Sequence, residues 1–207
     1  MQNKLLWNAD IKRKKNSNLK KFSEKISQKY KINFNDDFTK LYSWSIRNPE
    51  NFWKEFWDYS QIIGSKGDEV ITKNKIFYKN VFFKNSKLNF TENLLFKSND
   101  DIAIYSLKEG GINEKITWKQ LRENVCKISY FLKKIGLNKN DRVAGYIPNT
   151  IESVESFLAV TKNGYIWSSC SPDFGIQGLV DRFKQIDPKV LFTCDYYFYN
   201  GKKINIL

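Results

Sequence analysis

The chain of 207 residues contains no histidine and only three cysteines. Without an imidazole, mechanisms that depend on a histidine base are excluded, as are most zinc and iron sites. Cys126, Cys170 and Cys194 are an odd number without close spacing, so we expect free, reduced thiols. No apolar run approaches the roughly 20 residues of a membrane helix, and the first residues lack the apolar core of a signal peptide. We therefore expect a cytoplasmic protein without a membrane partner.

The composition and charge indicate a globular protein with a basic surface. Hydrophobic residues make up 41% and aromatic residues 16%, which argues against disorder. The net charge is +13, but lysines occur in every segment, so we expect no nucleic-acid partner. The basic run Ile11–Lys21 precedes a short predicted helix, and it either holds phosphates or forms a solvated leader. Composition favours the leader.

The last third of the chain alternates short apolar runs with amphipathic segments. Between Asp141 and Asp195 the order is strand, helix, strand, helix, strand, in the segments RVAGYI, NTIESVESFLAVTKNG, YIWSS, GIQGLVDRFKQIDP and KVLFTC. Strands that are nearly all apolar and are joined by helices predict a parallel sheet that is buried on both faces. The fold class is therefore α/β.

Capping signals define the helices of this region. Thr117 and Gln120 form a predicted capping box, and an apolar stripe runs from Leu121 to Ile135. Asn149 and Glu152 predict a second box at the start of the next helix. Before the first helix, the strand IAIYSL (102–107) is expected to pair with EKITW (114–118) through a turn at Gly110 and Gly111.

The N-terminal part is expected to be helical and rich in aromatic residues. Asn48 and Pro49 indicate a helix start, with the helix running to about Ile62. Its Phe and Trp pairs, four residues apart, predict a broad aromatic face that must be buried, by docking against the larger domain rather than as a ligand-stacking platform. Residues 64–87 predict an irregular connector, and 89–96 predict a short helix.

Several motifs identify a family. DRVAGYIPN (141–149), NGYIWSSCSPDFG (163–175) and YNGK (199–202) resemble acetoacetyl-CoA synthetases of the adenylate-forming family. LYSWSIRNPENFWKEFWDYSQI and SKLNFTENLL resemble the segment that precedes the adenylating domain in these enzymes and in acetyl-CoA synthetases. The resemblance implies a basic helical leader (1–35), an acetyl-CoA-synthetase-type N-terminal segment (36–97), and an incomplete parallel-sheet part of an AMP-binding domain (98–207).

The resemblance also implies where ligands bind. In open α/β sheets, ligands lie beyond the carboxyl ends of the strands. The loop 148–150 is either a pocket wall or only a helix cap. In the family, the loop 170–175 lies beside the route of the CoA thiol, which makes Asp173 and Phe174 candidates for lining a pantetheine tunnel. Alternatively, Asp173 caps the helix that starts near Ile176.

A third loop, residues 199–203, is the best candidate for a CoA contact. Acetyl-CoA synthetases carry an Arg-x-Gly-Arg type turn here that holds the phosphates of CoA. The present chain keeps Gly201 and has Lys202 and Lys203, but Tyr199 stands where the first arginine would fall. Lysine holds a phosphate as a point charge, without the bidentate geometry of arginine. The alternative is an ordinary Asn-Gly turn with exposed lysines.

The complete family enzyme joins acetoacetate to CoA with ATP and Mg²⁺, giving acetoacetyl-CoA, AMP and pyrophosphate. No stretch of this chain matches the family's phosphate loop, adenine-binding motif, ribose-binding aspartate or adenylation lysine. We therefore expect no catalytic or metal-binding residues, and no activity of this chain alone.

Three hypotheses follow from these observations. The first is the N-terminal part of an acetoacetate–CoA ligase, or of another short-chain acyl-CoA synthetase, truncated or completed by a second polypeptide. The second is a non-catalytic binding module that retains the scaffold. The third, disfavoured by the even spread of lysines, is a basic binder of nucleic acids or membrane surfaces. A parallel sheet that ends at the strand 189–194 would expose an edge and apolar surface unless another chain covers it, so poor solubility or obligate pairing would favour the first over the second.

Overall fold

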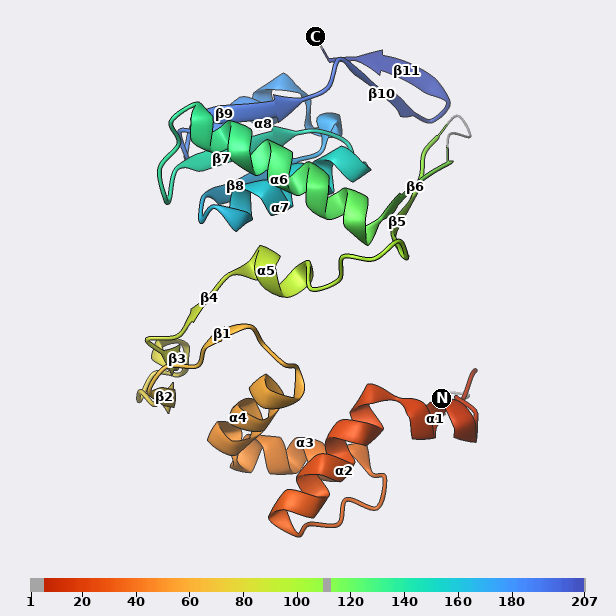
Figure 1. Ribbon diagram of the computed structural model, residues 1–207, viewed down its shortest axis with the longest axis vertical. Helices are drawn as coiled ribbons and strands as arrows, with labels where there is room; N and C mark the ends of the chain where they lie inside the picture. The colour runs from red at the N-terminus through yellow and green to blue at the C-terminus, as the bar shows by residue number, and fades with distance from the viewer. Residues whose placement is uncertain (1–5, 110–112, 207) are drawn as a thin grey trace. The chain divides into compact units, whose positions relative to one another are not determined.

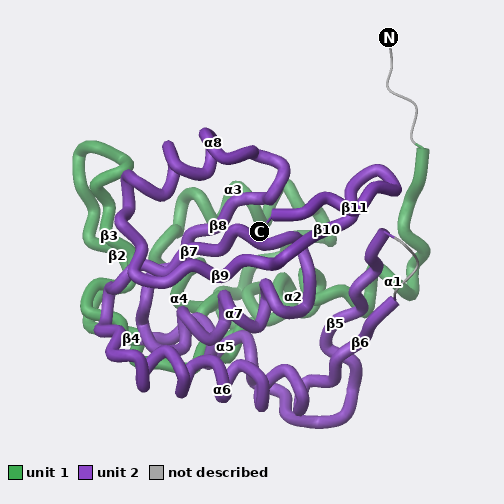
Figure 2. The backbone as a smooth tube through the Cα atoms, turned by 90° about the horizontal axis from the view of Figure 1, so that it is seen from above, with its two compact units in different colours: residues 1–87 green, residues 88–207 purple. Residues whose placement is uncertain are grey.

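A computed structural model of the chain describes residues 6–109 and 113–206. The chain divides into two compact units, residues 1–87 and residues 88–207 (Figure 2). The division at residues 35 and 97, expected from the resemblance, concerns similarity to other enzymes and stays a prediction. Within the described residues, no helix is both long enough and apolar enough to cross a membrane.

Unit 1 consists of four helices followed by short strands (Figure 1). The helices are α1 (Ile11–Asn16), α2 (Asn18–Tyr30), α3 (Phe38–Arg47) and α4 (Pro49–Tyr59). The strands are β1 (Gly64–Ser65), β2 (Glu69–Thr72), β3 (Val81–Lys84) and β4 (Lys87–Leu88), with the 3-10 helix η1 (Phe77–Lys79) between β2 and β3.

The basic run is itself helical, whereas the sequence predicted that it only precedes a helix. Asp10 accepts a hydrogen bond from the backbone N–H of Arg13 at 2.7 Å, and Ser17 accepts one from that of Lys20 at 3.2 Å. These two caps start α1 and α2, because each satisfies an N–H that a helix leaves unpaired.

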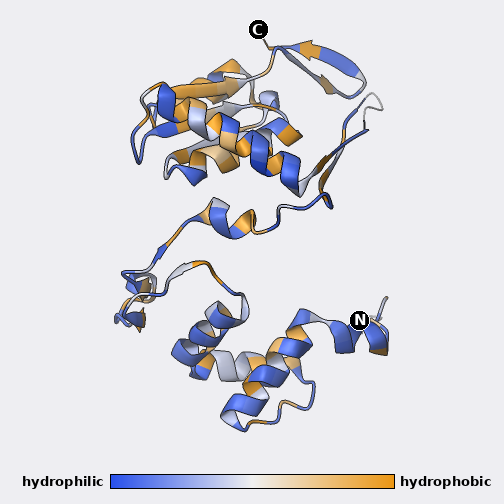
Figure 3. Ribbon diagram, viewed as in Figure 1, coloured by the Kyte–Doolittle hydropathy of each residue, from blue (hydrophilic) through white to orange (hydrophobic). Residues whose placement is uncertain are grey.

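The core of unit 1 lies between α2, α3 and α4. Its buried side chains are Phe22, Ile26, Phe34, Leu41 and Trp44. The two buried residues of α2 are Phe22 and Ile26, four positions apart, and Figure 3 shows hydrophobic and hydrophilic segments alternating along this helix. The edge of the Phe22 ring meets three rings of α4, with the nearest centroid 5.1 Å away at Tyr59. The helix α4 therefore packs within unit 1, and its docking against the larger domain stays a prediction.

The prediction that the whole aromatic face of α4 must be buried was wrong. Trp53 and Phe56 remain 37% and 42% exposed, and the only fully buried residue of the helix is Glu55. The helix also ends at Tyr59 rather than near Ile62, because Gln61 adopts a left-handed conformation. Asn48 occupies the N-cap position as expected, but its side-chain amide donates to the carbonyl of Trp44 and closes α3 instead.

The segment expected to be irregular contains an antiparallel hairpin. β2 pairs with β3 in a register that places Ile71 opposite Phe82. Phe83 of the hairpin packs on Trp57 of α4, with ring centroids 4.7 Å apart. These contacts are made between residues distant in sequence, which explains why local patterns did not reveal the strands.

Unit 2 contains a parallel sheet with helices on both faces. Its helices are α5 (Phe90–Leu94), α6 (Trp118–Lys134), α7 (Ile151–Lys162) and α8 (Gly175–Phe183), with the 3-10 helix η2 (Pro172–Phe174). Its strands are β5 (Ile102–Leu107), β6 (Asn113–Thr117), β7 (Arg142–Tyr146), β8 (Ile166–Cys170), β9 (Val190–Thr193), β10 (Tyr196–Tyr199) and β11 (Lys202–Asn205).

The three central strands confirm the predicted α/β fold. They lie in the order β8-β7-β9, and both pairs are parallel. Alternate residues of β7 face opposite sides, since Val143 belongs to the cluster formed with α6 and α7, whereas Ala144 belongs to the cluster that includes Phe183 of α8. β8 and β9 are the two edges of this sheet. The edge expected at the strand 189–194 is therefore present.

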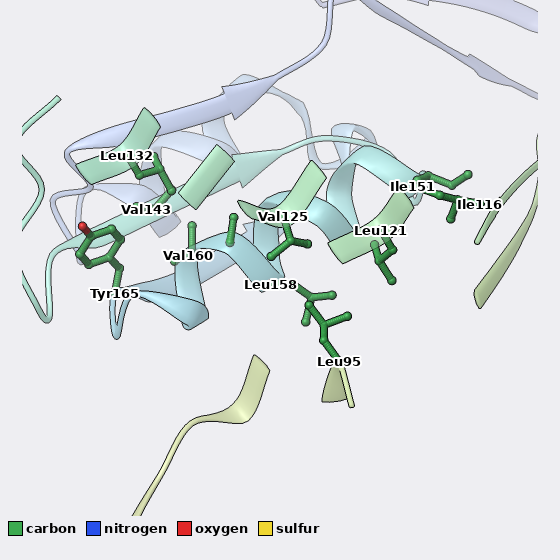
Figure 4. Close-up of a cluster of buried hydrophobic side chains, with 11 residues drawn as sticks. Leu95, Ile116, Leu121, Val125, Leu132, Val143, Ile151, Leu158, Val160 and Tyr165 are labelled. Carbon is green, nitrogen blue, oxygen red and sulfur yellow. The ribbon is translucent and has the colours of Figure 1, made fainter. Parts of the chain in front are cut away.

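The larger cluster forms the core of unit 2 (Figure 4). Leu132, Val143 and Leu158 are completely buried, and they come from α6, β7 and α7. The helix α5 joins this core through Thr91, whose hydroxyl donates to the carbonyl of Leu158 at 2.7 Å. It is shorter than the predicted helix over 89–96, because Asn89 acts as its N-cap and the chain leaves the helix at Leu95.

One predicted capping box is confirmed and the other is displaced by one residue. At α6, Gln120 N–H donates to the hydroxyl of Thr117, and Thr117 N–H donates to the side-chain oxygen of Gln120. At α7 the box is formed by Thr150 and Ser153, so the pair Asn149 and Glu152 was wrong.

The predicted hairpin of β5 and β6 is confirmed, with Ile104 opposite Ile116. The turn expected at Gly110 and Gly111 lies outside the described residues. A further hairpin, β10 with β11, follows the parallel sheet and was not predicted as a pair of strands.

Asp141, just before β7, bonds to the loop that precedes it and to the residue before β9. Its carboxylate accepts bonds from Lys189 Nζ at 2.8 Å and from Asn138 N–H at 2.7 Å, and these bonds lower its pKa. A lowered folded-state pKa adds stability above the ordinary value near 3.8, and that stability is lost as the pH falls through the folded-state value.

We therefore expect Asp141→Asn to lower the melting temperature at pH 7 and to lose less stability than the natural chain between about pH 5 and pH 2. Melting curves at several pH values test this, with Asp100→Asn in the exposed loop before β5 as the control. Parallel pH profiles for all three proteins would contradict it.

Candidate functional site

The carboxyl ends of the parallel strands carry the loops in which the sequence placed its candidate residues. The loop after β7 contains Pro148 and Asn149, and these two residues line two cavities. One, of about 370 Å³, lies towards β8, and the other, of about 660 Å³, lies towards β9. Since Thr150 of the same loop caps α7, the loop is both a pocket wall and a helix cap.

The loop after β8 is hydrogen-bonded to Tyr146 of β7. The hydroxyl of Tyr146, which is buried in the sheet, donates to the carbonyl of Pro172 at 2.7 Å. Ser171 donates to the carboxylate of Asp173 at 2.9 Å and accepts from its N–H at 3.5 Å, which caps the short helix η2. The interpretation of Asp173 as the cap of α8 was therefore wrong, because α8 begins at Gly175 without a side-chain cap.

Asp173 instead lies near the hairpin after β9. Burial, together with the neighbouring Asp173 carboxylate, raises the pKa of Tyr197 on β10. Phe174 is 49% exposed, and the guanidinium carbon of Arg182 lies 4.2 Å from its ring centroid. Asp173 and Phe174 thus form a surface beside the hairpin. Their role as a tunnel lining stays a prediction.

The third loop is the two-residue turn of the β10–β11 hairpin. Asn200 and Gly201 both have positive φ, 50° and 72°, which is the combination that a tight Asn-Gly hairpin turn requires. Tyr199 pairs with Lys202 across the turn. The interpretation as an Asn-Gly turn with exposed lysines is confirmed, and it leaves the predicted CoA contact untested.

The two lysines of the turn differ in their surroundings. The ammonium of Lys203 lies 3.8 Å from the ring centroid of Tyr196, so a cation–π interaction holds it on the hairpin. Lys202 is exposed, and among residues 6–109 and 113–206 no carboxylate lies within ion-pair distance of it. Over the same residues, no hydrogen bond or ion pair joins Asp173 or Phe174 to Gly201, Lys202 or Lys203.

Two contacts at this site were missed by sequence reasoning. They are the nearness of the Asp173 carboxylate to Tyr197, and the hydrogen bond that Gly201 N–H donates to the carboxylate of Glu109 at 3.0 Å. Aromatic residues before an Asn-Gly pair are a hairpin signal, so β10 was open to prediction. Nothing in the sequence indicated Glu109, which lies 92 residues before its partner.

The cysteines of the site are not arranged as nucleophiles. Cys170 ends β8 and Cys194 follows β9, and both are free. Burial raises the pKa of each thiol, which keeps it protonated at neutral pH. In the described part of the chain, no three Cys, Asp or Glu side chains gather as a metal site.

Comparisons with known proteins were made for both sequence and structure. The sequence profile of the family described as AMP-binding enzyme matches residues 92–205, more than half of the chain. The acetoacetyl-CoA synthetase of Gallus gallus is 42% identical over 100% of this chain and 31% of its own length. That of Rhizobium meliloti is 35% identical over 97% of this chain and 31% of its own. A malonamoyl-CoA synthetase of Penicillium aethiopicum is 36% identical over 96% of this chain.

A solved structure, acetoacetyl-CoA synthetase from Streptomyces lividans, superimposes with a TM-score of 0.90 at 28% identity, covering 98% of this chain and 32% of that one. The chain spans about a third of the length of the curated relatives that it matches. The resemblance drawn from the motifs is thereby confirmed, and so is the assignment to the N-terminal part of the fold.

Proposed function

Because the chain belongs to the family of AMP-binding enzymes, we propose that it is the N-terminal third of an acetoacetate–CoA ligase. The observation that carries the proposal is similarity along the whole chain, at 42% identity, to a protein named acetoacetyl-CoA synthetase. In the complete enzyme, the acetoacetate carboxylate attacks the α-phosphate of ATP and displaces pyrophosphate. The CoA sulfur then attacks the acyl carbon, its proton passes to solvent or a base, and AMP leaves.

The residues of this chain suit part of that chemistry. Lys202 has no carboxylate partner among the described residues, so its charge is available to hold a CoA phosphate. Gly201 allows the phosphate to approach the backbone closely, and Lys203 adds positive potential. Asp173 and Phe174 would face the rest of the CoA chain from the neighbouring loop. ATP and Mg²⁺ do not fit the described residues, which contain neither a metal cluster nor a glycine-rich phosphate loop.

The relatives differ in the acid for which they are named. The Penicillium protein named for malonamoyl-CoA is 36% identical to this chain, close to the 35% of the Rhizobium protein named for acetoacetyl-CoA. Identity in this third of the fold therefore does not separate the two acids. Assays need to include malonamate beside acetoacetate.

Reconstitution tests the proposal. The chain is joined to the part of the Gallus gallus protein that follows the matched segment, and AMP formation is measured with ATP, CoA and acetoacetate. We expect AMP only when both acid and CoA are present, and none from either part alone. A folded hybrid that binds ATP but forms no AMP with either acid would contradict the proposal, and would favour a non-catalytic module that kept the scaffold.

A further inference from the structure

The turn of the β10–β11 hairpin already holds an anion in this structure. The backbone N–H of Gly201 donates to Glu109 Oε2 at 3.0 Å, so a carboxylate occupies the position that an anionic ligand of the turn would take. The contact joins the end of the β5–β6 hairpin to the tip of the β10–β11 hairpin. The contact neither extends a strand nor caps a helix.

Negative charges surround Glu109, whereas the hairpin on the other side of the Glu109–Gly201 contact carries the positive charge of Lys202. The cavity of about 660 Å³ beside it is lined by Glu109, Glu114, Glu152 and Asp195, and by Lys108 as the single cation among its lining residues. Lys108 is paired with Glu114 at 2.6 Å. The wall on the Glu109 side is therefore acidic, whereas Lys202 on the hairpin has no carboxylate partner among the described residues. An anion that binds the turn must replace Glu109 and gains Lys202.

We propose that Glu109 is a built-in competitor whose carboxylate masks the anion site at Gly201 and Lys202, and that a phosphate group displaces it. A phosphate carries more charge and more acceptor oxygens than a carboxylate, so it can engage the turn N–H and the Lys202 ammonium together. Displacement breaks the hydrogen bond that joins Glu109 to the tip of the β10–β11 hairpin. The identification of the phosphate as that of CoA rests on the proposed function.

Binding of CoA to the 207-residue chain tests the inference, with pantetheine, which has no phosphate, and inorganic pyrophosphate as the other probes. We expect Glu109→Ala to bind CoA roughly fivefold more tightly than the natural chain, and Glu109→Gln, which keeps a neutral acceptor, to show a smaller gain. Glu114→Gln is the matched control, because it removes one charge from the same wall without touching Gly201. We expect it to change the affinity less than twofold.

Nuclear magnetic resonance of the Gly201 amide provides a readout that does not depend on affinity. Loss of the carboxylate in Glu109→Ala is expected to shift this resonance, and CoA is expected to shift it in the natural chain while pantetheine does not. A similar response to pyrophosphate identifies a general phosphate site, which also supports the inference. The inference would be overturned if Glu109→Ala and Glu114→Gln increased the affinity for CoA equally, or if CoA did not shift the Gly201 resonance.

The inference and the proposed function fail in different ways. If Lys202→Gln weakens CoA binding but the Glu109 variants do not strengthen it, the masking is wrong and the CoA contact stands. If the reconstituted enzyme is active and the chain's Gly201 and Lys202 do not respond to CoA, the masking is wrong and the ligase assignment stands. If reconstitution gives no activity while phosphate displaces Glu109, the anion site stands without the ligase.

Discussion

Replacing Gly145 by valine is expected to lower the free energy of unfolding of unit 2 by about 3 kcal/mol, because the central strand has no room for a side chain there. A Cβ atom at Gly145 would lie 2.5 Å from Cζ2 and 2.6 Å from Cη2 of Trp167. Carbon atoms do not approach this closely, so either the indole or the strand has to move. The large effect follows from how firmly that indole is held.

Trp167 lies across the sheet and is packed from both sides. Its ring centroid is 6.4 Å from that of Phe157 on α7 and 6.0 Å from that of Phe192 on β9. Its indole N–H donates to Ser169 Oγ at 3.2 Å. Gly145 lies on β7, the strand between β8 and β9. Because it has no side chain, the indole of Trp167 on β8 can extend over β7 towards β9.

Denaturant unfolding followed by hydrogen exchange of β7 and α7 amides measures this effect. Gly178→Ala is the control, because a Cβ there meets Phe174 at an ordinary 3.5 Å and lies inside α8. Alanine is favoured over glycine in a helix, so we expect this control to be neutral or to stabilise by about 0.5 kcal/mol. If Gly145→Val unfolded at the same denaturant concentration as the natural chain, the packing described for Trp167 would be wrong.

Replacing Lys29 by methionine is expected to destabilise unit 1 by about 2 kcal/mol, because it leaves a buried carboxylate without its cation. Glu55 is 1% exposed and lies in the middle of α4. Its Oε1 accepts from Lys29 Nζ at 2.5 Å and from the Tyr30 hydroxyl at 3.2 Å. The hydrogen bond to Glu55 raises the pKa of Lys29. Water reaches the half-exposed lysine, which keeps the expected loss below that of a fully enclosed pair.

Lys20→Met is the matched control on the same helix. Lys20 pairs with Glu24 and Asp36, whose side chains are 54% and 72% exposed, so its loss should cost clearly less stability than the loss of Lys29. The double variant Lys29→Met with Glu55→Leu removes the stranded charge and should recover most of the stability. Hydrogen exchange of α2 and α4 amides reports these changes for unit 1. Equal losses from Lys29→Met and Lys20→Met would contradict the account of Glu55.

The parallel sheet was predictable because its signals are local. The apolar runs of β7, β8 and β9 and the capping box at Thr117 are read from neighbouring residues, and the structure confirms them. The start of α7 was misplaced by one residue, because Asn149 and Thr150 are both good N-cap residues. Ser153, rather than Glu152, completes the box, a choice that side-chain geometry decides.

The hairpins and the contacts of the site were less predictable because they join distant segments. β2 (EVIT) and β3 (VFFK) are only four residues long and show no clear alternation of polar and apolar residues, and their pairing depends on packing against α4. The sequence placed Asp173 and Gly201 in the correct loops at the carboxyl end of the sheet. It did not reveal that Tyr197 lies near Asp173 or that Glu109 accepts a bond from Gly201, since only the fold brings those residues together.

The measurement that tests the central claim most directly separates the two half-reactions of the reconstituted enzyme. Acetoacetate-dependent exchange of pyrophosphate into ATP reports adenylation, and CoA-dependent release of AMP reports thioester formation. If this chain contributes the CoA contact, Lys202→Ala will leave the exchange unchanged and raise the KM for CoA about tenfold, while the control Lys184→Ala at the end of α8 will alter neither. Loss of pyrophosphate exchange in Lys202→Ala, or an unchanged KM for CoA, would contradict the account.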